Sequence, residues 1–564
     1  MGIKINIRKI FTFICILTLI FSNSIKTYAQ GTIPLVRVAI STNNFKSVVY
    51  GKTSINATAE YSVYDKVSAK PIVKLLPTDV LNIDLNGANG FKLSVNNKIV
   101  AKDLINTIVI DCPKGLLGVQ DLKRNGKPAL YHGVLEATPK NATAFYLINV
   151  LDLQSYLKGV VPNEMPVRFG LEALKAQAVA ARNYVLMPRT RAFKEFDVDD
   201  SVASQVYFGA STESELSNKA VEETEGLVAL YGWELILAQY SSTAGGYTES
   251  YENAFSDPKT REFPPKPKPY LKGRPDIYNV APLNREEEAR IFYMTCPDSY
   301  DMKSPYYRWQ RQWDAKELHD VIAKTLVDQS KTGFVKPEFK QDDTLGELKE
   351  LKVKRRGVSG KIMELEIVTD KETYHVQKEL VVRRLLQKNG VSLPSANMVF
   401  DNVLDENKKL NKVVAYGGGF GHGVGMSQYG AGFMSTSLHK PFDKILKRYY
   451  SGITISTCPI IIASDDAQKA AIQTFFAPSQ KAVLVVDNKF QIQEFNANIN
   501  GQDVAFEIAP KMLPFNRISR IDISSYIKNG KNKIIFYFPE KDCANKAIRL
   551  YIELIEKDNS EYAF

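Results

Sequence analysis

One glutamate stands out because of the residues around it. Glu164 lies in the stretch VVPNEMP (160–166), between two prolines and among apolar side chains, just ahead of an alanine-rich run. Burial among such neighbours raises the pKa of a carboxyl group toward the value that suits a proton donor. The positive end of a helix that begins soon afterwards would instead favour the ionised form. Two readings are therefore open: a catalytic acid, and a structural glutamate that binds backbone N–H groups at a helix N-terminus.

A glycine-rich run is the second stretch with functional character. GGGFGHGVGMSQYGAG (417–432) has no lysine for a phosphate-binding loop, does not fit GxGxxG, and departs from GxSxG around Ser427. Its glycines would let the backbone approach a ligand closely, with His422 and Gln428 as polar groups. The alternative is a set of tight turns inside a core.

The histidines and cysteines do not have the spacing of a metal centre. The five histidines include no HxxxH pair, and none lies near a cysteine at ligand spacing. We therefore expect no metal and no other cofactor. The basic residues are scattered and no nucleic-acid-binding module is recognisable, so a nucleic-acid partner is not expected either.

The N-terminus has the three-part pattern of a secretory signal peptide. Lys4, Arg8 and Lys9 precede an apolar run from Ile10 to Phe21, and small residues suited to cleavage end at Ala29. Cleavage there would lower the formal net charge from +11 to +7, because the segment holds four basic and no acidic residues. We expect an exported protein. The alternative is an uncleaved anchor, the one case in which membrane contact is expected.

The elements that must position these residues suggest an α+β fold, in which mixed strands and a few helices form a groove. Residues 34–150 read as short strands separated by turn signals such as Asn-Gly. Apolar residues at helical spacing predict a helix from about Leu171 to Leu186.

The second half of the chain begins with a proline-rich, exposed stretch within residues 256–303. A helix is expected near Asp314, and a hairpin with its turn at Ser359-Gly360. Residues 465–564 alternate like a separate antiparallel β-sandwich.

Four blocks in a fixed order resemble the stage II sporulation protein D family, which includes the amidase-enhancer proteins of bacterial cell walls. The blocks are YLKGVVPNEMPVRFGLEALKAQAVAARNY (156–184), YSSTAGGYTESYENAF (240–255), SPYYRW (304–309) and GGGFGHGVGMSQYGAGFM (417–434). The resemblance covers roughly residues 130–455, and residues 465–564 lie outside it. Together with the residue patterns it gives four expected regions: a signal peptide (1–29), an N-terminal β-rich region (30–130), a catalytic domain with the proline-rich insertion (131–460), and the C-terminal sandwich (465–564).

The resemblance implies a secreted or wall-associated lytic transglycosylase. Such an enzyme cleaves peptidoglycan glycan strands between N-acetylmuramic acid and N-acetylglucosamine, preferably strands without stem peptides. Glu164 matches the motif glutamate and would be the single general acid and base. Glycosidases that use water usually need two carboxyl groups. A lytic enzyme uses the C6 hydroxyl of muramic acid as its nucleophile, so one glutamate can serve.

The remaining motif residues would line the glycan groove through stacking and hydrogen bonds. The expected substrate-binding residues are Gln205, Tyr207, Ser242, Tyr247, Glu249, Glu252, Trp309, His422 and Gln428. For each of them, a structural polar group or a core aromatic is an equal alternative. Arg182, on the predicted helix, could pair with Glu164 and keep it ionised.

Some positions depart from the family pattern. Phe169 stands where the family usually has tryptophan, and Asn183 where it has threonine. Some members carry zinc, but this chain has no His or Cys between His132 and Cys296, so no zinc is expected. The rival function is a non-catalytic glycan-binding protein that presents strands to a cell-wall amidase. A carbohydrate-binding role for the C-terminal sandwich is a further hypothesis.

Overall fold

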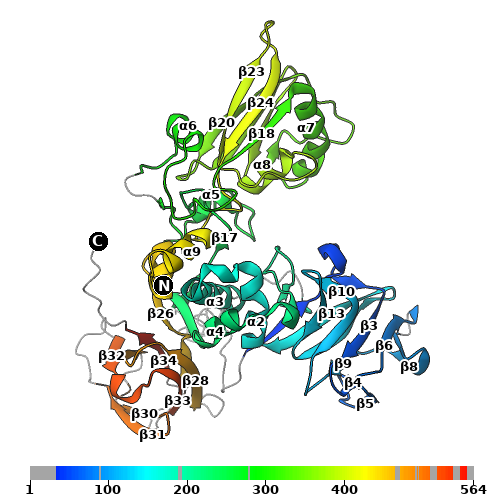
Figure 1. Ribbon diagram of the computed structural model, residues 1–564, viewed down its shortest axis with the longest axis vertical. Coiled ribbons are helices and arrows are strands. Elements are labelled where there is room, and N and C mark those ends of the chain that lie inside the picture. Colours follow the sequence, from blue (N-terminus) through cyan, green and yellow to red (C-terminus); the bar gives the residue numbers. More distant parts are fainter. Residues whose placement is uncertain are drawn as a thin grey trace, which may run out of the picture.

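The computed structural model describes most of the chain from residue 34 onward. The described residues are 34–87, 90–187, 194–276, 280–463, 470–488, 492, 494–508, 518–537 and 547–555. The predicted signal peptide (1–29) lies outside them. Among the described helices, none is long and apolar enough to cross a bilayer. Figure 1 shows a central group of helices with β-rich lobes around it.

Two mainly antiparallel sheets form the N-terminal lobe, at the right in Figure 1. The first runs in the order β14 (Val198–Asp199), β1 (Leu35–Ala39), β13 (Ala144–Asp152), β12 (Val134–Asn141), β9 (Ile108–Asp111), β4 (Tyr61–Asp65) and β5 (Pro71–Leu75), with β2 (Val49–Tyr50) also paired to β13. The second runs β11 (Lys127–Tyr131), β10 (Leu117–Arg124), β3 (Lys52–Ala57), β6 (Leu81–Leu85), β7 (Phe91–Val95) and β8 (Lys98–Leu104). Alternate strand residues are buried, and those of both sheets belong to one hydrophobic core.

Helices fill the centre of the molecule. They are α2 (Leu153–Glu164), α3 (Leu171–Leu186), α4 (Glu215–Glu222), α5 (Tyr251–Ala254), α9 (Gln428–Thr436) and α10 (Phe442–Tyr449). Helix α3 is the innermost, because its alanine-rich surface packs against α2, α4, α9 and α10. A short parallel pair, β17 (Tyr240–Ser241) with β25 (Met426–Ser427), joins segments far apart in the sequence.

Most of the chain between α5 and β25 forms the upper lobe in Figure 1, with a hydrophobic core of its own. It contains α6 (Glu286–Met294), α7 (Ala315–Ser330), α8 (Glu379–Leu385), the sheet of β18 (Trp309–Asp314), β24 (Leu410–Gly417) and β23 (Met398–Leu404), and the sheet of β19 (Val335–Lys336), β22 (Thr373–Gln377), β21 (Ile362–Thr369) and β20 (Leu348–Arg356). The insertion is therefore a folded lobe that extends well beyond the predicted proline-rich stretch.

The C-terminal strands form two sheets at the lower left in Figure 1. One consists of β28 (Ala470–Ala477), β33 (Gly530–Tyr537), β30 (Glu494–Ile499) and β31 (Gln502–Glu507). The other runs β16 (Glu234–Leu235), β15 (Leu227–Tyr231), β26 (Thr454–Thr457), β34 (Ala547–Leu554), β29 (Ala482–Asp487) and β32 (Ile518–Asp522), with β27 (Ile460–Ala463) also on β34. Because β15 and β16 precede the upper lobe in sequence, this second sheet joins the C-terminal strands to the central part.

The α+β prediction is confirmed, as are several elements. The helix expected over 171–186 is α3, Asp314 caps α7, and Ser359-Gly360 lies in the turn between β20 and β21. Helix α2 was not predicted. Its sequence contains Gly159 and Pro162, residue types that disfavour a helix interior.

Candidate active site

Glu164 is the last residue of α2, and this corrects its expected position near a helix N-terminus. Asp152 caps the start of α2 by accepting hydrogen bonds from the N–H groups of Gln154 and Ser155, at 2.9 and 3.0 Å. The carboxyl group thus lies at the negative end of a helix, which disfavours ionisation. The following helix, whose positive end was expected to favour ionisation, begins only at Leu171.

The surroundings of Glu164 favour a protonated carboxyl group near neutral pH. Part of the side chain stays accessible, although protein atoms surround it on most sides. Burial raises the pKa of Glu164 to about 7. Hydrogen bonds from the Val206 N–H and from the side chains of Tyr240 and Gln428 favour the ionised form and partly oppose this shift. The Val206 bond to Oε1 is 2.6 Å long. The group is therefore placed to exchange a proton at physiological pH.

A chain of polar side chains orients Tyr240 toward this carboxyl group. Tyr156 donates its hydroxyl to Gln205 Oε1 at 3.0 Å, and Gln205 Nε2 donates to the Tyr240 hydroxyl at 2.9 Å. The oxygen of Tyr240 is thus an acceptor from Gln205, which leaves its own hydrogen for Glu164. Burial and the nearby Glu164 raise the pKa of Tyr240 well above its usual value, so it stays a donor.

The parallel pair β17–β25 brings Gln428 to the same place. Tyr240 is opposite Met426 and Ser241 opposite Ser427, so Gln428, at the start of α9, follows directly. The glycine-rich run permits this approach. Gly425 has φ +74°, and a Cβ there would run into the carbonyl oxygen of Gln239.

His422 lies in the same loop and acts as a neutral hydrogen-bonding group. Its Nδ1 accepts the Val424 N–H at 3.0 Å, and its ring packs on Phe255 with 5.1 Å between centroids. Burial, with the charges of Lys361 and Arg383, lowers its pKa to about 3, while a backbone hydrogen bond with Tyr240 opposes the shift. The histidine is therefore uncharged at neutral pH and cannot serve as a cationic group.

Two buried carboxylates of the loops below the upper lobe hold the site in place. Asp301 Oδ2 accepts the Gly245 N–H at 2.8 Å and the hydroxyl of Thr243. Glu249 accepts five hydrogen bonds, from Ser250, Asn253, Val358 and, twice, Ser359. Since Val358 and Ser359 belong to the upper lobe, this lobe is tied to the 240–255 segment that carries Tyr240.

Four of the expected substrate-binding residues are too buried for that role. Tyr207 donates to Asn149 at 2.6 Å, Trp309 donates to the Gly419 carbonyl at 3.2 Å, and Tyr247 packs in a small apolar cluster. Their exposed fractions are 1%, 8% and 4%, and that of Glu249 is 0%. The aromatic rings are thus core residues, and the oxygens of Glu249 are fully used inside the protein.

The other five expected residues differ in whether they contact Glu164 directly, through another residue, or not at all. Gln428 contacts Glu164, Gln205 acts through Tyr240, and His422 lies beside the Tyr240 backbone. Ser242 is partly accessible, and its carbonyl accepts the Tyr429 N–H at 3.1 Å. Glu252 lies on α5, where burial and the charge of Glu249 raise its pKa; no contact joins it to Glu164.

Arg182 does not pair with Glu164. Its guanidinium donates to the Leu227 carbonyl at 2.9 Å and to Gln154 Oε1 at 3.2 Å. Within the described parts of the chain, no group of three or more His, Cys, Asp or Glu side chains is placed to hold a metal ion.

Sequence reasoning missed two groups that contact Glu164, the side chain of Tyr240 and the Val206 N–H. Tyr240 opens a block that was recognised, but nothing local separates it from the other tyrosines. A backbone N–H leaves no signal in a sequence at all.

Comparisons with known proteins agree with the motifs. The Stage II sporulation protein family model matches residues 141–231, and a domain of unknown function (DUF8618) matches residues 258–425, most of the upper lobe. The amidase enhancer of Bacillus subtilis (strain 168) is 31% identical over 315 residues, which are 53% of this chain and 40% of that protein. This chain thus spans well under half of that relative.

Two further relatives are matched over more of their length. Stage II sporulation protein D of Bacillus subtilis (strain 168) is 29% identical over 349 residues, 59% of this chain and 82% of the relative. An uncharacterized protein of Brachyspira hyodysenteriae is 27% identical over 437 residues, 77% of this chain and 95% of that protein. The family prediction is confirmed in that residues 141–231 match the Stage II sporulation protein family model, and the chain is similar to stage II sporulation protein D and to the amidase enhancer.

Proposed function

We propose that this protein remodels the bacterial cell wall as a lytic transglycosylase, with Glu164 as its acid and base. The observation that carries the proposal is the carboxyl group of Glu164, whose pKa is raised by burial to about 7 beside three hydrogen-bond donors. A carboxyl group with this pKa is protonated often enough at neutral pH to donate a proton and ionised often enough to take one back. The substrate would be a peptidoglycan glycan strand, preferably without stem peptides.

The proposed reaction needs no second carboxylate. Protonated Glu164 gives its proton to the glycosidic oxygen as the bond from that oxygen to C1 of muramic acid breaks. The C6 hydroxyl of the same sugar then bonds to C1, and its proton passes to the carboxylate, which restores the starting state. No water is consumed. The donors from Val206, Tyr240 and Gln428 stabilise the carboxylate between the two proton transfers.

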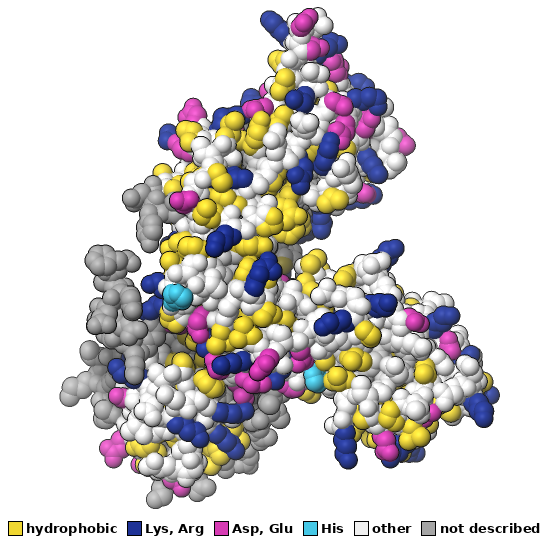
Figure 2. Space-filling view, viewed as in Figure 1, with side chains coloured by type: hydrophobic (Ala, Val, Ile, Leu, Met, Phe, Trp, Pro, Cys, Tyr) yellow, Lys and Arg dark blue, Asp and Glu magenta, His cyan; other side chains and the backbone are white. Residues whose placement is uncertain are grey.

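The accessible residues around Glu164 are the proposed sugar contacts. Ser242 and Glu252 are partly accessible, as is Tyr429, whose ring could pack on a sugar face. Gln428 is buried and would act on the substrate through Glu164. We expect binding outside the cell, at the wall. Figure 2 shows positive and negative side chains interspersed on the face in view.

A non-catalytic role is the second candidate, because one relative is named an amidase enhancer. In that case the protein would present glycan to a cell-wall amidase, and Glu164 would be a structural residue. The test is to compare the full chain and the Glu164→Gln variant for binding to and cleavage of peptide-free glycan strands. The enzyme proposal expects equal binding and cleavage only by the wild type. Equal binding with no cleavage by either would favour the presenting role.

We also propose that the C-terminal strands bind carbohydrate, because they form a two-sheet arrangement. Because one sheet includes β15 and β26, the region should be tested within the full chain. Wall-binding of Glu164→Gln should then weaken when Lys533 and Tyr537, exposed residues of β33, are replaced. Unchanged binding would remove this role.

A further inference from the structure

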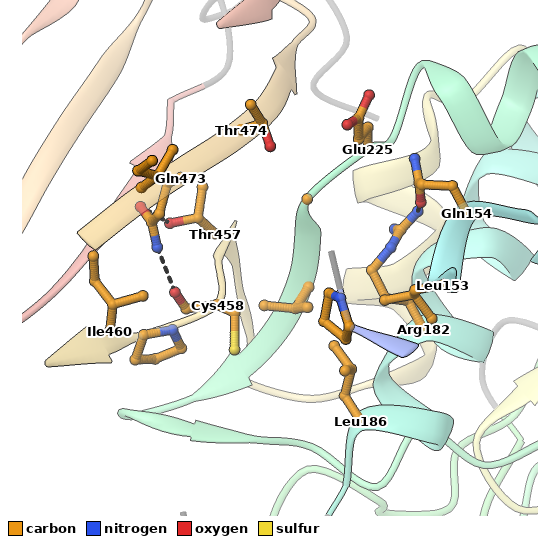
Figure 3. A pocket seen from close by; sticks show the side chains of 15 residues that line it. Leu153, Gln154, Arg182, Leu186, Glu225, Thr457, Cys458, Ile460, Gln473 and Thr474 are labelled. Atoms are coloured by element: carbon orange, nitrogen blue, oxygen red, sulfur yellow. Dashed lines mark hydrogen bonds between the residues drawn. The ribbon is translucent and has the colours of Figure 1, made fainter. Parts of the chain in front are cut away.

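A cavity of about 150 Å³ lies away from Glu164, between the central helices and the C-terminal strands. Its walls come from the start of α2, the end of α3, β15 and the segment from β26 to β28. Figure 3 shows Gln154, Arg182 and Glu225 on one side, facing Thr457 and Gln473 on the other. None of the groups that contact Glu164 lines this cavity.

Arg182 is the unusual residue in its wall. The side chain is 1% exposed, yet its two hydrogen bonds go to neutral acceptors, the Leu227 carbonyl and Gln154. Its Nε–H has no hydrogen-bond partner. A buried guanidinium normally has a carboxylate partner and uses all its donors. Burial lowers the pKa of Arg182 to about 9, with only the charge of Glu225 opposing the shift.

The charges around the cavity leave this cation unbalanced. Glu225, the acidic residue of the wall, is ion-paired with Lys531 at 2.8 Å. The positive charge of Lys531 therefore balances the negative charge of Glu225, and the positive charge of Arg182 has no carboxylate among the described residues to balance it. An anion next to this buried cation would gain more than it would in water, because the effective dielectric constant inside a protein is lower.

The size and lining of the cavity define the anion. A cavity of about 150 Å³ has room for several water molecules and therefore for a small organic acid. Most of the lining is apolar, including Leu153, Leu186 and Ile460. A phosphate needs donors on several sides, whereas a carboxylate with a short apolar tail matches one guanidinium edge and an apolar wall.

We propose that this cavity is a binding site for a small monocarboxylate, whose oxygens accept from the guanidinium of Arg182 and whose carbon atoms contact the apolar wall. The carboxylate could be a free acid or the end of a larger molecule, such as the lactyl group of a peptide-free muramic acid. The site is separate from Glu164 and does not depend on the proposed reaction.

The test is a saturation-transfer NMR titration of the full chain with lactate, propionate, propionamide and N-acetylmuramic acid. Inorganic phosphate has no carbon-bound protons, so it is tested as a competitor of propionate. Propionamide is the neutral match for propionate. The variants are Arg182→Met, which removes the cation, and Ile472→Trp, which fills the cavity from an exposed position on its rim. Gln502→Trp, on an exposed position of β31 outside the cavity, is the matched control.

We expect propionate and lactate to bind at least about tenfold more tightly than propionamide and phosphate, as one charged hydrogen bond allows. Both cavity variants should lose this binding, while Gln502→Trp should keep it. If Arg182→Met does not fold, the comparison of Ile472→Trp with Gln502→Trp still tests the proposal. Binding of N-acetylmuramic acid through the same residues would identify the lactyl group as the source, and binding of the free acids alone would identify a free acid. Equal binding of propionamide, or binding that survives Ile472→Trp, would overturn the proposal.

Discussion

Replacing Glu164 by glutamine should change how stability depends on pH, without any substrate. The pKa of Glu164 is about 7 in the folded protein, against 4.5 for a glutamate side chain in the unfolded chain. The native carboxyl group therefore holds its proton over a range where the unfolded one has lost it. Stability contributed by the protonated form is fully present below about pH 4.5 and is lost as pH rises through 7.

The size of the effect follows from the shift. A difference of about 2.5 pKa units corresponds to about 3 kcal/mol of free energy of unfolding that wild type loses between pH 4 and pH 8. Glutamine is neutral throughout and loses none of it. The stability of Glu164→Gln relative to wild type should therefore rise by about 3 kcal/mol over this range, whatever the offset at pH 4.

Thermal unfolding followed by calorimetry at pH 4, 5, 6, 7 and 8 measures this difference. Glu215→Gln, at an exposed position at the start of α4, is the control and should show no such trend. A stability difference between Glu164→Gln and wild type that stays constant from pH 4 to pH 8 would refute the buried acid with a raised pKa.

Three further predictions concern activity and the frame of the site. Activity should fall about tenfold per pH unit above pH 7, because Glu164 then loses the proton that it must donate. In Tyr240→Phe this fall should begin at a higher pH, because the hydrogen bond from Tyr240 lowers the pKa of Glu164. Profiles of rate against pH for the two proteins measure both effects. Glu249→Gln should lower the melting temperature and the activity together, since each donor left unpaired costs about 1–3 kcal/mol. Gly425→Ala should reduce kcat/KM, because its methyl group runs into the Gln239 carbonyl; unchanged kinetics would contradict the loop geometry.

The periodicity of apolar residues in the sequence identified the helices and strands whose burial follows that periodicity. The alanine-rich spacing of α3 and the alternating strands before residue 150 could be predicted, because their burial follows the helical and strand periods. Helix α2 could not, because Gly159 and Pro162 argue against a helix. The structure shows why Gly159 is there: a Cβ would run into the ring of Tyr207.

The missing helix altered the reading of Glu164. Without α2, the carboxyl group was placed ahead of a positive helix end, whereas it lies at a negative one. Both this end and burial favour the protonated form, so the structure resolves a conflict that the segment alone left open.

The expected sugar contacts failed where burial depends on distant segments. Tyr207 is covered by Tyr156, with 5.3 Å between ring centroids, and Trp309 lies on β18 beside β24. Glu249 is held by Ser359, 110 residues away in the chain. Contacts of this range have no local signal, so a polar or aromatic residue in a motif cannot be assigned to the groove or to the core from sequence.

The most direct test of the central claim is the chemical form of the product ends. The full chain is incubated with peptide-free glycan strands, and the products are read by mass spectrometry. The lytic reaction predicts ends that carry anhydro-muramic acid with wild type and none with Glu164→Gln. Reducing ends that carry an added water would contradict it, because they require a hydrolase and a second carboxylate.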